Sequence, residues 1–268
     1  MKPGFFETAK YCISLSDPGD KCSAVVELAE ALDSGSCSWD TRHPVEPAGV
    51  PGRPPRPELV EPSQVPRRRL GSEKGRAALV HAIAHIEFNA INLALDAAYR
   101  FRGMPIEFYR DWISVAVDEA RHFTLLERRL CELGSEYGAF PAHNGLWEMA
   151  VKTAGSCLVR MALVPRVLEA RGLDVTPGMI KRLQDVGDQE TVAALNVILA
   201  EEVRHVAIGT NWFRYCCEKE RLDPMATFLD LLKRYYPHSL KGPFNLEARY
   251  EAGFTREEMN ALTAGFPG

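Results

Sequence analysis

The sequence contains no pair of cysteines spaced C-x-x-C, and its seven cysteines make an odd number. A zinc ribbon or a rubredoxin-like iron site is built from such pairs, so both kinds of site are excluded. The N-terminal residues also lack the apolar core of a signal peptide. We therefore expect free thiols in a reducing, cytoplasmic environment.

Long apolar runs and a strong charge of one sign are missing as well. No run reaches the ~18 apolar residues that a membrane span requires. Lys and Arg number 32 against 36 Asp and Glu, and the resulting net charge of −4 disfavours a general nucleic-acid or membrane binder. With 46% hydrophobic residues over 268 positions, the chain can bury a substantial core. Strand patterns are also lacking, which favours an all-α protein.

Composition divides the chain into three segments. Residues 1–71 combine a short helix, expected to be capped by Asp20, with a proline-rich extended strap, and residues 34–70 alone hold eight prolines and six arginines. Residues 72–220 are expected to form a four-helix bundle. Residues 221–268 are expected to add a C-terminal helical extension that packs on the bundle, with a capping box at Thr255 and Glu258.

Start and stop signals place the helices of the bundle. The first is expected from Ser72 to just before Gly103, and the second from about Pro105 to Gly134. The third should start near Gly145, kink at Pro165 and break over residues 172–177, and a short helix should then begin with Thr176 as its N-cap and Pro177 as its first residue. The fourth should run from Asp188 to about Glu220. The prediction is a bundle with a broken third helix.

The tetrapeptide Glu-x-x-His occurs twice, at Glu119–His122 and at Glu202–His205. Two residues three apart on a helix lie on one face, so the carboxylate and the imidazole can bind the same metal ion. One such tetrapeptide arises easily by chance. Here both lie in the same longer pattern, an acid followed by Glu-x-Arg-His.

A lone glutamate precedes each motif at a matched distance. Glu87 lies 32 residues before Glu119, and Glu169 lies 33 residues before Glu202. The core thus reads as two copies of one unit, a helix with a glutamate followed by a helix with Glu-x-x-His. Four carboxylates and two imidazoles form the ligand set of di-iron and di-manganese bundles. The predicted metal ligands are Glu87, Glu119, His122, Glu169, Glu202 and His205.

Neighbouring residues are candidates for support of these ligands. Asp118 and Glu201 each lie four residues before a ligand histidine, where a carboxylate can accept the imidazole N–H that does not bind metal. Arg121 and Arg204 could offset the charge of those acids. Plain surface ion pairs remain the alternative. His81 and His85 are expected to be core or surface histidines, and the cluster Arg67–Arg69 is poor support for RNA binding.

On these residues the sequence resembles the ferritin-like di-iron carboxylate superfamily, and within it a bacterial ferritin-like family of unassigned function, over about residues 60–250. Storage ferritins lack the second ligand histidine, and rubrerythrins usually carry a four-cysteine module that is absent here. Ribonucleotide reductase small subunits place a radical tyrosine where this chain has Leu126. The resemblance therefore implies an oxygenase or oxidase, similar to multicomponent monooxygenases and MiaE-like tRNA hydroxylases.

The first hypothesis is a non-haem di-iron oxygenase or oxidase, with Glu119 and Glu202 as bridging, catalytic ligands. It implies two iron ions, or a manganese–iron pair, with O2 as co-substrate, an external electron donor and a small organic substrate. The alternatives are a ferroxidase or peroxide scavenger, a MiaE-like tRNA hydroxylase, and a helical scaffold without turnover. No membrane partner is expected, and a homodimer stays open.

Overall fold

The computed structural model describes residues 4–39, 41, 44–47, 49–65, 69–236 and 240–264. Within these ranges the protein is all-α, as predicted. They contain no strand, only the two isolated β-bridges Gly4–Ser38 and Leu59–Ala142. All seven cysteines are free thiols.

Contacts group the residues into two compact units, each described here by itself. Unit 1 comprises residues 1–154 and 186–194, and unit 2 comprises residues 155–185 and 195–268. The helices of unit 1 are α1 (Phe5–Ser14), α2 (Pro18–Asp33), the 3-10 turn η1 (Pro62–Gln64), α3 (Glu73–Arg100), α4 (Ile106–Glu132) and α5 (Gly145–Lys152). Those of unit 2 are α6 (Cys157–Leu163), the π-helical turn η2 (Val164–Glu169), α7 (Ala170–Asp185), α9 (Pro224–Tyr235), α10 (Leu246–Glu251) and α11 (Arg256–Ala264). Helix α8 (Gln189–Glu220) begins in unit 1 and continues in unit 2. The segment boundaries after residues 71 and 220 remain predictions from composition.

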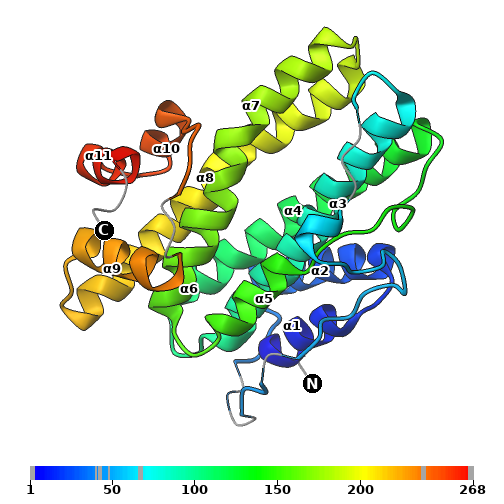
Figure 1. Ribbon diagram of the computed structural model, residues 1–268. Helices are drawn as coiled ribbons and strands as arrows, with labels where there is room; N and C mark the ends of the chain where they lie inside the picture. Colours follow the sequence, from blue (N-terminus) through cyan, green and yellow to red (C-terminus); the bar gives the residue numbers. More distant parts are fainter. Residues whose placement is uncertain are drawn as a thin grey trace. The chain divides into compact units, whose positions relative to one another are not determined.

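The paired helices α3 and α4 form the centre of unit 1, with α1 packed against α3 and α2 against α4 (Figure 1). Their ends follow the predicted signals. The Ser72 side chain accepts the Gly75 N–H at 3.1 Å, and Gly103 and Gly134, at φ +79° and +66°, follow the two helices. By length and composition alone α3 could cross a membrane, but 78% of its most apolar window is buried within the protein, as in a core helix.

Helix α2 starts three residues earlier than predicted. Asp17, not Asp20, is its N-cap, and the Asp17 carboxylate accepts the Asp20 N–H at 3.0 Å. Pro18 then occupies the first helical position, where its missing N–H costs nothing because that donor would have no partner inside the helix. The Asp17-Pro18 pair is therefore the stronger start signal.

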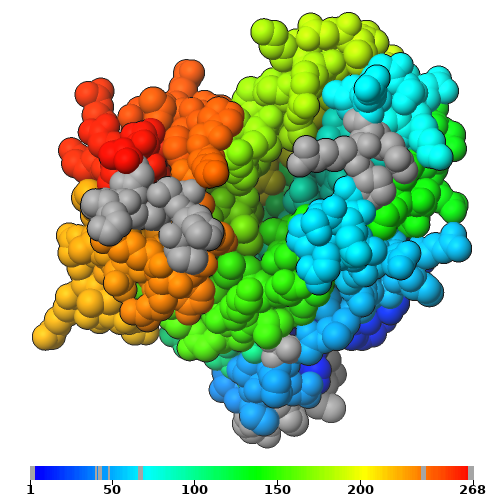
Figure 2. Space-filling model, in the orientation of Figure 1, coloured from blue at the N-terminus to red at the C-terminus, as the bar shows by residue number. Residues whose placement is uncertain are grey.

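The proline-rich strap lies on unit 1 and forms part of its surface in Figure 2. Backbone groups hold it at several points: Gly52 N–H donates to Ile13 O at 2.8 Å, and Val60 N–H donates to Ala142 O at 2.8 Å. The Trp147 indole donates to Gly49 O at 2.8 Å. These bonds replace the regular ladder that prolines prevent, so the described part of the strap wraps its unit.

The predicted third helix is interrupted earlier than expected. Helix α5 ends at Lys152, and α6 begins at Cys157 with the Ser156 hydroxyl accepting the Val159 N–H at 3.2 Å. The Thr153 hydroxyl bonds to Met149 O at 2.7 Å, a side-chain bond that competes with helix continuation. A continuous helix from Gly145 to Arg171 was therefore the wrong prediction.

The predicted break over residues 172–177 is also wrong, because α7 runs through Pro177 without interruption. Proline removes the hydrogen bond that would reach the carbonyl four residues earlier, here Leu173 O. The Asn245 side-chain amide donates to that carbonyl at 3.2 Å instead. The irregularity lies one turn earlier, in η2, where Ala170 N–H bonds to Pro165 O in the i to i−5 pattern of a π-helix.

The remaining caps agree with prediction. The Asp188 carboxylate accepts the Thr191 N–H at 3.1 Å at the start of α8, and it also binds Arg129 and Arg76 at 2.9 and 3.3 Å. In unit 2 the capping box of α11 is formed: Thr255 N–H donates to Glu258 at 2.8 Å, and Glu258 N–H donates to the Thr255 hydroxyl at 3.1 Å. The local signals were sufficient to place these helix starts.

Candidate metal centre

Two helices of unit 1 bring three of the predicted ligands together. Glu87 lies midway along α3, and Glu119 and His122 lie one turn apart on the adjacent α4. Small side chains near them, among them Ala84, Ala90, Ala116 and Ala120, are buried and leave room for close packing of the two helices. The three polar side chains therefore meet inside the unit.

The three side chains form a tight, buried group. His122 Nδ1 lies 3.2 Å from Glu87 Oε2 and 3.3 Å from Glu119 Oε2. Glu119 and His122 are fully buried, and Glu87 is 3% exposed. One atom from each residue lies within 4.8 Å of the others, so the group could hold a metal ion. Carboxylate and imidazole ligands suit iron and manganese.

Burial sets the electrostatics of this group. Burial, followed by repulsion from Glu119, raises the pKa of Glu87 above its ordinary value. Burial acting alone would lower the pKa of His122, but hydrogen bonds to Glu119 and Glu87 raise it. The group thus retains protons that balance its two carboxylates.

These observations favour a cation at the three ligand atoms. Two carboxylates in a site with almost no solvent exposure need positive charge nearby, since isolated buried charges are very costly. A divalent ion would supply that charge and release the protons, which is the usual linkage between metal binding and ligand pKa. The donor set therefore fits the metal that the sequence predicts.

Unit 2 carries the other three predicted ligands. On α8, His205 Nδ1 lies 3.8 Å from Glu202 Oε2, with His205 fully buried and the Glu202 side chain 12% exposed. Glu169 is partly exposed and ends the π-helical turn η2. The Glu-x-x-His pair of α8 thus repeats the spacing of α4, with a slightly longer separation.

A close backbone approach positions η2 against α8. A Cβ atom on Gly209 would lie 2.1 Å from Pro165 Cγ and 2.2 Å from Pro165 Cβ. Only glycine leaves room for the proline ring at this contact. Gly209 follows His205 by one turn, and Pro165 precedes Glu169 by one turn, so the contact sets the approach of the two ligand-bearing elements.

The predicted supporting residues lie nearer the surface. Arg121 is exposed and pairs with the partly buried Asp118 at 3.1 Å. On α8, Arg204 is exposed and Glu201 is partly buried. Arg67 and Arg68 of the basic cluster lie outside the described residues. The supporting roles of all four side chains remain predictions.

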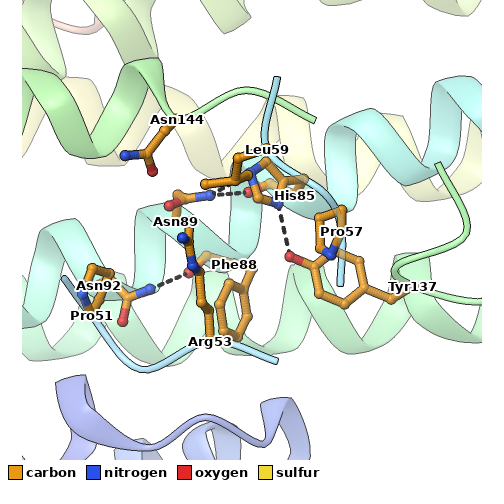
Figure 3. A pocket seen from close by; sticks show the side chains of 10 residues that line it. All are labelled: Pro51, Arg53, Pro57, Leu59, His85, Phe88, Asn89, Asn92, Tyr137 and Asn144. Atoms are coloured by element: carbon orange, nitrogen blue, oxygen red, sulfur yellow. Dashed lines mark hydrogen bonds between the residues drawn. The ribbon is translucent and has the colours of Figure 1, made fainter. Parts of the chain in front are cut away.

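A second polar cluster in unit 1 ties α3 to the loop before α5. His85 Nδ1 lies 2.8 Å from the Tyr137 hydroxyl, and the Asn89 amide donates to His85 O at 2.8 Å (Figure 3). His85 Nε2 also lies 3.2 Å from His143 O. His81 Nε2 accepts the Gly138 N–H at 2.9 Å. The cavity beside His85 measures about 10 Å³, room for about one water molecule. Both histidines are therefore core residues that anchor a loop.

Among the buried charged residues of unit 2 that sequence reasoning missed are Arg166 and the Glu258 carboxylate that pairs with it at 2.6 Å. A signal for the first was present, because Arg166 is a lone charge within the apolar stretch from Met161 to Leu168. Glu258 was identified only as a helix cap. Its partner lies 92 residues away and could not be found from local pattern.

Comparisons with known proteins assign a family and no activity. The model of a family described as "Protein of unknown function (DUF455)" matches residues 14–260. A Haemophilus influenzae protein described as "Uncharacterized protein" is 42% identical over 266 residues, which cover 96% of this chain and 92% of the relative. No solved structure matches the chain.

Proposed function

The chain belongs to the family described as "Protein of unknown function (DUF455)", and from its own residues we propose that it is a ferritin-like di-metal enzyme that activates O2 to oxidise an organic substrate. The observation that carries the proposal is the buried Glu87–Glu119–His122 group of unit 1. Three ligand-type side chains that are almost completely buried are an arrangement that a bound cation accounts for.

The second half of the proposed centre comes from the matched sequence unit. Glu169, Glu202 and His205 repeat the order and nearly the spacing of Glu87, Glu119 and His122. In this proposal the six side chains would hold two ions, with Glu119 and Glu202 shared between them and the other four side chains each holding one. A ligand set of this kind is the one that ferritin-like bundles use for di-iron and di-manganese pairs.

The chain's own residues have three tasks in this proposal. The four carboxylates and two imidazoles would bind the two cations and orient the site. Asp118 and Glu201 fix the histidine tautomers, and Arg121 and Arg204 offset their charge. Surrounding apolar side chains such as Phe88 and Phe123, both buried, exclude water from the reacting atoms. Two bound iron ions would supply the redox chemistry that reduces O2, with electrons from an external cytoplasmic donor.

The first test is metal content per chain after anaerobic Fe(II) loading. We expect about two irons in the wild type, the number that the six-ligand set of a ferritin-like bundle holds. Glu119→Ala should lose most of this iron because it removes a ligand from the buried group. Glu132→Ala removes an exposed acid from the same helix, so it should retain wild-type iron. Equal iron in all three proteins, or none in the wild type, would contradict the proposal.

Oxygen uptake then separates the proposed reaction from iron handling. An oxygenase or oxidase should consume O2 in proportion to an added organic substrate and reductant. A ferroxidase or peroxide scavenger should consume oxidant with Fe(II) alone. A tRNA hydroxylase should require tRNA, and its tRNA binding should weaken as salt is raised.

A further inference from the structure

The most unusual buried charge in unit 2 is Arg166. Its side chain is completely buried, and it lies on the π-helical turn η2, three residues before the proposed ligand Glu169. The Arg166 guanidinium donates to Glu258 Oε1 at 2.6 Å. This ion pair joins η2 to α11, the C-terminal helix of the described chain.

Aromatic rings enclose the same guanidinium on several sides. Its central carbon lies 4.0, 4.6 and 4.8 Å from three ring centroids, those of Phe228, Phe254 and Phe213. Such contacts attract a cation and also exclude water from it. The rings come from α9, from the turn before α11 and from α8, so the cage gathers much of unit 2 around one residue of η2.

The hydrogen bonding of the caged group is incomplete. Arg166 Nε and Nη1 have no hydrogen-bond acceptor among the described residues. Burial lowers the pKa of Arg166, and the Glu258 carboxylate opposes that change. A buried pair with unsatisfied donors is a poor source of stability, since well-packed apolar residues of the same size are often as good or better. We therefore assign this pair a role in geometry and not in stability, because the planar arginine guanidinium fixes the direction as well as the length of its hydrogen bonds.

The acceptor of this ion pair is held rigidly. Glu258 Oε2 also accepts the Thr255 N–H at 2.8 Å in the capping box of α11. One carboxylate thus binds the helix start through one oxygen and Arg166 through the other. Glu258 is 3% exposed, which leaves little freedom for an alternative rotamer.

The turn that Arg166 anchors needs such a restraint. A π-helical turn is rare and occurs mostly in short pieces at functional sites. In η2 the π geometry sets the direction in which the Glu169 side chain projects from the helix, because the extra residue in the turn rotates the positions that follow. Pro165 holds η2 against α8 through its contact with Gly209. Arg166 holds η2 against α11 through its ion pair with Glu258.

We propose that Arg166 is a positioning residue, and that α11, through Glu258, sets the orientation in which Glu169 is presented to a metal ion. This inference rests on the proposed function for the identity of the ligand. Its structural part, the restraint of η2 by the C-terminal helix, stands on the contacts within unit 2 alone.

Unit 2 offers a matched control in a second buried arginine pair. Arg249 on α10 donates to both carboxylate oxygens of Asp174 on α7, from Nε at 2.9 Å and from Nη2 at 2.7 Å. Like Arg166, Arg249 is buried and contacts the Phe254 ring. This pair also joins the C-terminal segment to the third helix, but its acceptor Asp174 lies five residues beyond η2. Arg249 Nη2 also lies 3.5 Å from Ala170 O, directly after η2.

The experiment compares Glu258→Gln with Asp174→Asn, each replacing one buried carboxylate by an amide of the same shape. Fe(II) affinity is measured by titration, and amide hydrogen exchange of residues 164–170 is measured on the metal-free protein. For Glu258→Gln we expect one of the two ions to bind about 10-fold or more weakly, the usual effect of losing a supporting contact. Exchange in residues 164–170 should become faster.

For Asp174→Asn we expect faster exchange near residues 173–177 and unchanged affinity for both ions. Should Glu258→Gln fail to fold, Arg166→Lys repeats the test, because lysine keeps the charge but cannot reproduce the fork. Wild-type metal affinity and exchange in these variants, or equal loss of metal in Asp174→Asn, would overturn the inference. Absence of metal in the wild type itself would instead reject the proposed function. The exchange of residues 164–170 in Glu258→Gln would then still test whether α11 restrains η2.

Discussion

At the scale of single residues, His81 and His85 show how burial converts a titratable group into a pH-dependent stability term. Burial lowers the pKa of each to about 4, and for His85 the charge of His81 adds to the effect. An unfolded histidine titrates near 6.5, so between pH 6.5 and 4 the unfolded chain binds more protons than the folded chain. The stability contributed by the neutral pair is present above pH 6.5 and is lost as the pH falls toward 4.

We therefore expect the free energy of unfolding to fall by on the order of 2 kcal/mol for each of the two histidines between pH 7 and 4.5. The double variant His81→Gln/His85→Gln should lose less stability over the same interval, since glutamine can accept hydrogen bonds but does not titrate. Urea unfolding at both pH values measures the difference. The exposed His143→Gln is the control and should behave like the wild type. An unchanged acid loss in the double variant would contradict this assignment.

Lys21 shows a residue-scale feature that no local pattern predicts. Its side chain is fully buried, and its ammonium donates to Cys12 O at 2.9 Å, Ile13 O at 2.8 Å and Asn92 Oδ1 at 2.7 Å. An ammonium has three donors, and here each has an acceptor. Burial nevertheless lowers the pKa of Lys21 to about 7, because no carboxylate offsets its charge. Lys21 links α2, the end of α1 and the middle of α3.

At the scale of elements, the course of the third helix depends on two prolines with opposite outcomes. Pro177 stands inside α7, where Asn245 bonds the carbonyl that it leaves free. Pro165 is the second residue of η2, where the ring packs on Gly209 and the backbone takes π geometry. Proline thus leaves the α-helix uninterrupted at position 177 and accompanies π geometry at position 165, depending on which residues pack against it.

Gly209→Ala should destabilise the protein because its Cβ would lie 2.1 Å from Pro165 Cγ. Overpacking of this kind costs about 1–3 kcal/mol, and here it should also displace η2. Gly178→Ala on α7 is the matched control, since nothing lies within 4 Å of its added Cβ. That variant should be stabilised by up to about 1 kcal/mol through helix propensity. Urea midpoints of the two variants give the comparison, and a Gly209→Ala protein as stable as Gly178→Ala would refute it.

At the scale of the whole molecule, the proposed ligands divide evenly between the two contact-defined units. Glu87, Glu119 and His122 belong to unit 1, and the matched Glu169, Glu202 and His205 belong to unit 2. Helix α8 carries the chain from one unit into the other. If all six bind one pair of ions, as proposed, metal binding must stabilise residues of both units.

The corresponding prediction is a metal-dependent rise in Tm. An ion that binds only the folded chain adds about 2.7 kcal/mol at a free concentration 100 times its Kd. Mn(II), which is stable in air, should raise the Tm of the wild type and of Glu132→Ala but hardly that of Glu119→Ala. Hydrogen exchange should slow near Glu87 and near Glu202 together. Slowing confined to one unit would reject a shared centre while leaving a single-metal site in place.

Much of the fold was available from the sequence because its signals are local. Ser72, Asp188 and Asp223 cap the helices that follow them, and Gly103 and Gly134 end α3 and α4 in the left-handed conformation that glycine adopts most easily. The all-α class follows from the same signals. The Glu-x-x-His spacing likewise needs no partner, because three residues are one helical turn wherever the helix lies.

The sequence by itself determined the starts of α3, α8 and α11, the candidate ligands and their doubled order, since each depends on neighbours a few residues away. Only the tertiary structure decided whether the third helix breaks at Pro177, because the bond that prevents a break comes from Asn245. It also decided that Glu87, Glu119 and His122 are buried together, and that Arg166 is held by Glu258 across 92 residues. Burial and long-range pairing depend on which surfaces meet, and periodicity along one chain segment carries no information about its partner.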